Sequence, residues 1–577
     1  MHKVKLEHGA QSYGENTGHV SALGFLQSQY NTCQEKHTVC RANMPVDAFM
    51  PTRLVDVRHG GELVHLLERP EKASYVTLSH CWGGLKPFAL TKSTATQLKD
   101  GILISCLPKT FQDAIAVTRK FQMRYIWIDT LCIFQDDVDG RDWAFEAGRM
   151  KDTYKRAAFC IAATAAENGN AGLFYERDLR ALTPIKINFE PGLSSSYATT
   201  CGSRSPLAGP YWIGCEQSTR VAIDSACLNR RAWVAQERYL SPRIMHFTQE
   251  TLFWECHESF RCEFSRHEIS WGNRAHALKP LISNFRERFP NLELLGQRSK
   301  VVAESTNLRN QFYDAWRNFR TAYTHCGMSK ESDVLVALQG VSQDVAEVLN
   351  ERMIAGLLES HLVAELCWYN SWSGTLKDSH RPAKWRAPSW SWASTMLPIG
   401  FGSLIGLKEQ HDMIKIIDSH VESRPSGELI QASLWIECRP LAAEIRGSFI
   451  HIDGVTRQQS GNPTLDSNDR VYVMLDDPIP NGKDEKNIRN VYIVIVRHVN
   501  DGNGIEGLVL VPCEEMDEKT CNPHYHHDTR GLPYLEKSER FQRIGICDTS
   551  SLNEYAEYGK RLLIKHEQTE SRIIELV

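Results

Sequence analysis

The chain has 577 residues, of which 42% are hydrophobic and 24% charged, and its formal net charge at pH 7 is -4. This length exceeds what one hydrophobic core normally organises, so it predicts about two to four domains. The near-neutral balance argues against extended nucleic-acid binding, and the sequence contains no run of about 18 apolar residues that would span a bilayer.

The N-terminal residues are polar and include Cys33, His37 and Cys40. They lack the apolar core and the small-residue cleavage site of a secretory signal, which favours a cytoplasmic protein. The seventeen cysteines form no CxxC pair and lie mostly in apolar runs, so we expect buried free thiols. The spacing of Cys33, His37 and Cys40 fits no common zinc pattern. We therefore predict that residues 1–50 form a small helical N-terminal segment that packs on the main domain, and that the chain has no metal site.

Three short apolar runs follow, at residues 74–79, 125–129 and 158–164. Their near-continuous apolar character predicts parallel strands that are covered on both faces. Apolar residues at helical spacing between 111 and 121, and again between 143 and 157, predict a helix in each gap. Strand and helix thus alternate, which is typical of a doubly wound, mostly parallel α/β sheet.

Further along the chain, residues 178–220 are rich in Ser, Gly and Pro and predict a long irregular excursion. The apolar segment 228–256 predicts a short helix or turn and then a strand at Ile244–Phe247. We expect an α/β domain over residues 51–262 and a mainly helical extension over residues 263–395.

The last expected domain, residues 396–577, is rich in short β-type runs with turn signals between them. This spacing predicts an antiparallel barrel or sandwich. The expected strands are Glu428–Glu437, Arg470–Leu475, Asn490–Val496, Gly507–Val511, Arg543–Cys547 and Arg561–Ile564. Upstream of it, Trp385, Trp390 and Trp392 alternate with small residues, which indicates packing across a domain junction.

Polar residues and glycines follow each predicted strand of the α/β domain. In an open α/β sheet, ligands bind beyond the carboxyl ends of the strands. The sequence therefore predicts that the first two strand ends lie beside a ligand site, to which the segment after residue 228 contributes. The candidate ligand-binding residues are Ser79, His80, Cys81, Trp82, Gly83, Cys132, Gln135, Trp233, Gln236 and Arg243.

Three of these segments together resemble the signature blocks of the fungal heterokaryon incompatibility (HET) domain. The first reads YVTLSHCWGG and the third LNRRAWVAQERYLSPRIMHF. The second begins with YIWIDTLCIFQDD and continues through DW and E to RMKDTYKRAAFCIAATAA. A later segment, RPAKWRAPSWSWAS, is similar to a run that commonly follows this domain in long HET proteins. The resemblance extends from about Pro51 to Ser394.

The resemblance implies a role in fungal non-self recognition, where the domain triggers incompatibility or cell death after unlike hyphae fuse. It also implies a distant likeness to TIR domains, some of which cleave NAD with a glutamate while others are assembly adaptors. Three functions thus stay open: a signalling effector, an NAD or nucleotide glycohydrolase, and a non-catalytic adaptor that associates with itself or with a protein partner. We expect no bound cofactor, with NAD as a candidate substrate.

The candidate catalytic carboxylates are Asp129, Glu146 and Glu237. Asp129 closes an apolar strand, where a carboxylate must be hydrogen-bonded or open to a crevice; the alternative is that it caps the following segment. Glu146 is placed to pair with Arg149 on one helix. Glu237 is placed either near the ligand or in an ion pair with Arg243, whose guanidinium is also a candidate phosphate donor.

Cys81 next to His80 suggests a thiol nucleophile, which needs a base within hydrogen-bond reach. Neighbouring residues on an extended chain point to opposite faces, however, so a structural thiol is the favoured interpretation. Zinc at Cys81, Cys132 and His80 is a weaker hypothesis. The tryptophans at 82, 127 and 233 are either stacking platforms for a ring or core anchors.

Overall fold

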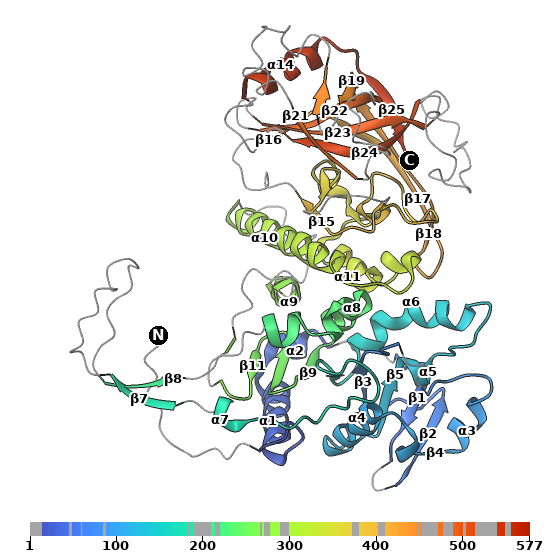
Figure 1. Cartoon of the computed structure of the whole chain (residues 1–577), viewed down its shortest axis with the longest axis vertical. Coiled ribbons are helices and arrows are strands. Elements are labelled where there is room, and N and C mark those ends of the chain that lie inside the picture. Colours follow the sequence, from blue (N-terminus) through green and yellow to red (C-terminus); the bar gives the residue numbers. More distant parts are fainter. Residues whose placement is uncertain are drawn as a thin grey trace. The chain divides into compact units, whose positions relative to one another are not determined.

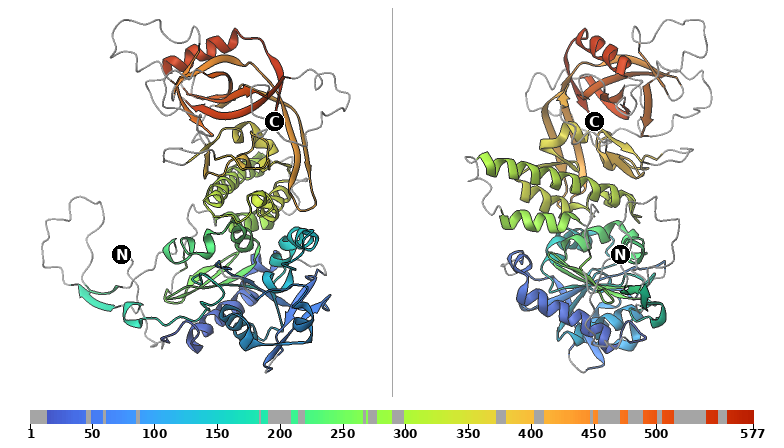
Figure 2. Two further views of the ribbon diagram at one scale, coloured as in Figure 1. Left: turned by 45° about the vertical axis from the view of Figure 1, so that its right-hand side comes forward. Right: turned by 90° about the vertical axis from the view of Figure 1, so that its left-hand side faces the viewer.

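The computed structural model divides the chain into two compact units, Met1–Gly272 and Asn273–Val577 (Figures 1 and 2). No helix in the described parts of the chain is long and apolar enough to cross a membrane. The residues that the structure describes are 14–44, 49–58, 61–84, 88–182, 185–189, 209–213, 220–265, 268–269, 277–288, 299–371, 380–401, 410–446, 449–452, 471–476, 489–499, 504–513, 539–548 and 556–577.

A nine-stranded sheet forms the centre of the first unit, in the order β11-β10-β9-β6-β3-β5-β1-β2-β4. The four central strands, β9, β6, β3 and β5, are parallel. The apolar runs predicted this arrangement for β3, β5 and β6, and β9 was predicted as a strand without a place in the sheet. The strands on both sides of them are antiparallel. The bounds are β1 Arg53–Asp56, β2 Leu63–Glu68, β3 Tyr75–Ser79, β4 Ile102–Leu103, β5 Tyr125–Ile128, β6 Cys160–Ala162, β9 Arg243–Phe247, β10 Leu252–Cys256 and β11 Phe260–Cys262.

Helices cover both faces of this sheet. The chain runs from β3 through α4 (Lys109–Lys120) to β5, and then returns through α6 (Arg141–Lys155) past β3 to β6. On one face, Tyr30 of α1 (Val20–Lys36) contacts Phe121 and Phe159 edge-on. On the other face, the Tyr75 hydroxyl donates to the carbonyl of Thr153 at 2.8 Å, and α6 packs against α8 (Ala232–Leu240). Because the chain reverses direction across the sheet, the boundary between β3 and β6 is a topological switch point.

Three shorter helices complete the first unit: α2 (Thr38–Ala42), α3 (Ala95–Asp100) and α5 (Asp129–Cys132). The segment predicted to be irregular, residues 178–220, contains α7 (Leu179–Leu182) and an antiparallel pair, β7 (Ile185–Phe189) with β8 (Gly209–Ile213). The prediction there was therefore incomplete. Ser, Gly and Pro mark turns well, but they do not exclude a short hairpin between the turns.

The second unit begins with helices α9 (Leu278–Arg288), α10 (Ser299–Thr324), α11 (Gln339–Leu349) and α12 (Leu362–Glu365). Around them lie the short strands β12 (Met353–Ile354), β13 (Leu357–Leu358), β14 (Trp368–Asn370) and β15 (Ile399–Phe401). The Trp392 indole donates to the Gly356 carbonyl and the Trp390 indole to the Leu576 carbonyl, each at 3.0 Å. These two tryptophans thus contact segments far apart in the sequence, both within the second unit.

The C-terminal part of this unit is an antiparallel barrel with extra strands. Strands β22, β19, β20, β21, β24 and β23 pair in that order, and β23 returns to β22, which closes the ring. Its interior is aliphatic and includes Ile445, Ile493 and Val509. The bounds are β16 Gln410–Asp412, β17 Lys415–Ser423, β18 Leu429–Cys438, β19 Leu441–Arg446, β20 Phe449–His451, β21 Val471–Leu475, β22 Arg489–Val499, β23 Gly504–Pro512, β24 Glu539–Asp548 and β25 Arg572–Leu576.

Five of the six strands predicted in this region are confirmed, and the sixth is wrong. The run Arg561–Ile564 lies within helix α14 (Ala556–Glu567), which covers the barrel in Figure 1. A four-residue apolar run does not distinguish a strand from a buried helix face. Here Leu562 packs into the barrel core while Ile564 is exposed, which is the pattern of a helix with one apolar side.

Candidate functional site

The candidate site lies at the carboxyl ends of β3 and β5, next to the switch point. Ser79 is the last residue of β3, and its hydroxyl donates a hydrogen bond to the Glu237 carboxylate of α8. The Tyr154 hydroxyl of α6 forms a second hydrogen bond with Glu237. Residues that are far apart in the sequence therefore meet at the sheet edge where α/β proteins bind ligands.

Glu237 is the most strongly perturbed carboxyl group of this cluster. Its side chain is buried, and burial raises its pKa to about 7 although Arg231, Ser79 and Tyr154 act in the opposite direction. The nearby charge of Asp129 raises the pKa further. A carboxyl group that titrates near neutral pH is suited to exchange a proton or to stabilise a developing positive charge.

Asp129 lies beside Glu237 and is held by three groups. The backbone N–H of Thr130 donates to Oδ1 at 2.7 Å, and the Trp82 indole donates to Oδ2 at 3.1 Å. The Nδ1 atom of His80 is 3.6 Å from Oδ1. Asp129 is the first residue of α5, where its carboxylate accepts from the next backbone N–H, and its side chain is still 26% exposed. This local role and a role toward a ligand are compatible.

His80 and Arg231 complete the cluster. Burial lowers the pKa of His80, which favours the neutral imidazole, and its ring contacts Phe111 edge-on at 5.0 Å. The Arg231 guanidinium donates to the backbone carbonyl of His80. Arg231 and Tyr154 were not among the predicted site residues. Arg231 lies within the third signature block and Tyr154 within the second, but Tyr154 also belongs to an apolar helical stripe, which favoured a core role for it.

Cys81 is buried against Cys227 rather than against a base. Its hydrogen bond with Cys227, and then burial, raise the pKa of the Cys81 thiol, whereas the same hydrogen bond lowers the pKa of Cys227 to about 7. His80 points to the face of α4, and none of the described contacts joins its ring to Cys81. The geometry supports the structural thiol over the nucleophile.

Glu146 and Cys132 belong to a different cluster. Glu146 lies 3.9 Å from the Arg53 guanidinium of β1, and the same guanidinium donates to the Cys132 carbonyl at 2.9 Å. Burial raises the pKa of Glu146 and raises that of Cys132 to about 12. The expected partner, Arg149, instead donates to the Met50 carbonyl at 2.8 Å. The described contacts do not connect Glu146 to the pair of Ser79 and Glu237.

Arg243 lies at the opposite end of the sheet. It is the first residue of β9, and its guanidinium donates to the Cys33 sulfur and to the Ala158 carbonyl, both at 3.1 Å. The suggested ion pair with Glu237 is therefore wrong: Arg243 has these partners at the amino end of β9, whereas Glu237 is bonded to Ser79 at the carboxyl end of β3. The adjacent Arg238 forms ion pairs instead, with Glu255 and Asp224.

The other predicted ligand-binding residues lie around the rim or on α8. The Gln135 amide donates to the Ile133 carbonyl at 2.9 Å and to the Asp129 carbonyl at 3.4 Å. Trp233 contacts Trp143 edge-on at 6.1 Å, which is a helix–helix contact. Gln236 is buried on α8. Of this group, Gln135 is the one tied directly to Asp129.

Gly83 holds the loop after β3 against the loop after β6, and we predict that Gly83→Ala destabilises the fold. Its φ is +65°, and a Cβ would lie 2.5 Å from the Glu167 carbonyl and 2.8 Å from the Asn168 Cα. Gly84 has a similar φ of +58° but open space around it. Urea unfolding should show a loss of about 2–4 kcal/mol for Gly83→Ala and about 1 kcal/mol for Gly84→Ala. Equal losses would contradict the close contact.

Comparison with known proteins supports the resemblance seen in the sequence. No curated protein and no solved structure matches the chain. One family model does match, and its match begins at Tyr75, the first residue of β3, and ends at Glu237. Residues 75–237 match the family described as heterokaryon incompatibility protein (HET), and the matched segment contains Ser79, Asp129 and Glu237.

Proposed function

We propose that this chain is a HET-type effector of fungal non-self recognition that acts in the cytoplasm. In this proposal the α/β domain triggers incompatibility or cell death, and the C-terminal barrel recognises a partner or regulates the effector. The HET match over residues 75–237 supports the first part. The closed barrel supports the second, because it is a separately packed structure with its own aliphatic core.

We further propose that the α/β domain cleaves a nucleotide such as NAD between its ribose and nicotinamide. The observation that carries this proposal is Glu237, a buried carboxyl group at the switch point whose pKa is about 7. Retaining such a group costs stability, because a buried carboxylate is poorly solvated. A group of this kind at a ligand-binding edge is typical of functional sites.

The chemistry requires few groups. As the C–N glycosidic bond breaks, its electron pair leaves with nicotinamide and positive charge develops on the ribose. The ionised carboxylate of Glu237 would stabilise that charge, water would add to the ribose carbon, and a proton would be released. A cationic nicotinamide bound nearby favours the ionised form of Glu237. The positive charge of Arg231 lowers the pKa of Glu237, and its guanidinium is suited to bind a phosphate oxygen. The Asp129 carboxylate is suited to accept a hydrogen bond from a ribose hydroxyl.

The test is incubation of the purified full chain with NAD, with nicotinamide followed by chromatography. The proposal expects nicotinamide and ADP-ribose in equal amounts. In parallel, induced expression of the chain in a filamentous fungus should arrest growth. Growth arrest without any NAD loss would favour a self-associating adaptor and would sink the enzymatic proposal; absence of both effects would also remove the effector assignment.

A further inference from the structure

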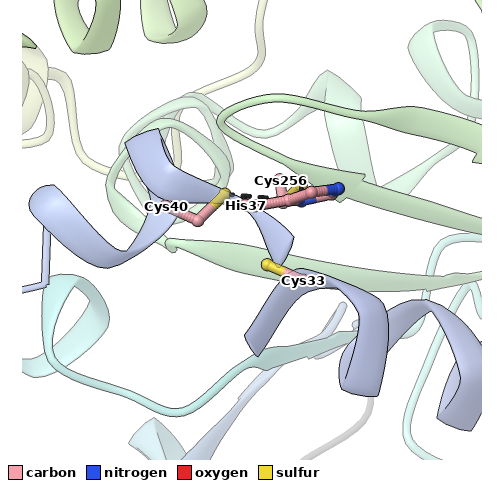
Figure 3. A group of neighbouring side chains, drawn as sticks. All are labelled: Cys33, His37, Cys40 and Cys256. Atoms are coloured by element: carbon pink, nitrogen blue, oxygen red, sulfur yellow. Dashed lines mark hydrogen bonds between the residues drawn. The ribbon is translucent and has the colours of Figure 1, made fainter. Parts of the chain in front are cut away.

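Four potential metal ligands from two distant segments converge in the first unit (Figure 3). Cys33 lies in the last turn of α1, His37 follows that helix, and Cys40 lies in α2. Cys256 is the last residue of β10 and follows His37 by 219 positions. Their three sulfur atoms and one ring nitrogen all lie within 4.8 Å of one another.

The distances are those of a tetrahedral metal site. The Nδ1 atom of His37 is 3.4 Å from the Cys256 sulfur and 3.8 Å from the Cys40 sulfur. For zinc, with bonds of about 2.3 Å to sulfur and about 2.0 Å to nitrogen, the edges of a tetrahedron are about 3.5–3.8 Å long. The two nitrogen–sulfur distances are therefore close to those that one zinc ion would impose, and all four ligand atoms lie within 4.8 Å of one another.

The surroundings also suit a metal bound by thiolates. Cys33, Cys40 and Cys256 are fully buried. The Arg243 guanidinium is also buried and donates a hydrogen bond to the Cys33 sulfur at 3.1 Å. Hydrogen bonds of this kind orient and stabilise thiolates that bind a metal. Three thiolates with a divalent ion leave one negative charge, which the guanidinium balances. Both Cys40 and Cys256 approach the same Nδ1 atom of His37, which identifies that atom as the ligand.

A disulfide explains the cluster less well. All three cysteines are free thiols in the structure. Any one disulfide among them would leave the third sulfur and the His37 nitrogen without a role. It would also require a sulfur–sulfur distance of about 2.05 Å, well below the spacing of a tetrahedral cluster.

We propose that Cys33, His37, Cys40 and Cys256 bind one structural zinc ion that fastens α1 and α2 to the edge of the sheet. Four protein ligands leave no open position, which is the arrangement of structural rather than catalytic zinc. Cys256 pairs across from Arg243 at the start of β9, so this site lies at the opposite end of the sheet from Ser79 and Glu237. The spacing of Cys33, His37 and Cys40 alone fits no zinc pattern, because the fourth residue of this cluster, Cys256, lies 219 positions beyond His37.

The first test is the metal content of the full chain, purified without a histidine tag and without added metal. Mass spectrometry of the metal should find one zinc per chain. Cys256→Ser should lose that zinc and lower the melting temperature, whereas Cys160→Ser, which replaces another buried cysteine of the same sheet, should keep it. Zinc retained in full by Cys256→Ser would overturn the assignment.

A second measurement covers the case in which Cys256→Ser does not fold. Wild-type protein stripped of metal and loaded with Co²⁺ should show the visible bands of tetrahedral cobalt and a sulfur-to-cobalt charge-transfer band. Addition of zinc should remove both and raise the melting temperature. Wild-type protein that carries no zinc and gives a spectrum of hydrated Co²⁺ alone would refute the site, whatever the variants do.

Discussion

Glu237→Gln should reduce nicotinamide release from NAD by at least about 100-fold, while the fold becomes more stable above neutral pH. The loss follows because the amide cannot carry the negative charge that stabilises the breaking glycosidic bond. The gain follows from burial, which raises the Glu237 pKa to about 7 from the ordinary 4.5. Activity should be measured by chromatography and stability by urea unfolding of the same preparations.

The direction of the pH dependence is determined by that pKa. Between about pH 4.5 and 7 the folded chain holds a proton on Glu237 that the unfolded chain has lost, so wild-type stability falls as the pH rises through this range. The upper limit of this fall is on the order of 3 kcal/mol, since each pKa unit corresponds to about 1.4 kcal/mol. The amide does not titrate. The stability advantage of Glu237→Gln should therefore be small at pH 5 and largest at pH 8.

A matched control is Glu167→Gln, which alters an exposed carboxylate near the same rim. It should change neither nicotinamide release nor the pH dependence of stability. If Glu237→Gln retained full activity, the glycohydrolase proposal would fail. If Glu237→Gln lowered the stability of the fold at pH 8, Glu237 would be a structural partner of Ser79 and Tyr154, and its carboxylate would not be a group that lowers stability.

The centre of the fold was predictable because local patterns determine it. The runs around Val76, Ile126 and Ile161 are almost continuously apolar and rich in β-branched and aromatic residues, which favours strands buried on both faces. The proximity of Ser79 and Asp129 then follows from topology, because residues at the ends of neighbouring parallel strands share one edge. Glu237 comes from α8, and its hydrogen bond with Ser79 depends on how that helix packs. The antiparallel strands β1, β2, β10 and β11 carry no comparable signal, since their neighbours are set by the packing of the whole sheet.

The features that were missed depend on contacts between distant residues. Tyr154 occupies a core position of α6, and only the position of α8 shows that its hydroxyl reaches Glu237. In the sequence, Cys256 is one of several cysteines that lie in apolar runs. Only the contact between α1 and β10 in the fold brings it close to Cys33 and His37. Glu146 was expected to pair within its own helix, but the fold brings Arg53 closer. Spacing along one element does not reveal partners supplied by another.

Glu365→Gln should produce the largest loss of stability in the second unit, about 3–5 kcal/mol. Glu365 and Arg320 are both fully buried, and the Glu365 carboxylate accepts from two nitrogens of Arg320 and, at 2.9 Å, from the Leu358 backbone N–H. The amide would leave the Arg320 charge buried without its counter-charge, which is far costlier than loss of an exposed pair. Calorimetry of the full chain should show the transition of the second unit lowered by roughly 10 °C.

The same unit offers a control that separates burial from charge. Arg352 and Glu359 also form an ion pair, at 3.2 Å, but their side chains are 65% and 43% exposed. Glu359→Gln should therefore cost no more than about 0.5 kcal/mol, because water solvates the arginine that remains. Replacing both members of the buried pair, Arg320→Leu with Glu365→Leu, should recover part of the loss, since no unpaired charge is left. The opposite outcome is a double variant that is less stable than Glu365→Gln alone. In that case the hydrogen bonds from Arg320 to Gly356 and from Leu358 to Glu365 would contribute more to stability than the charge pairing does.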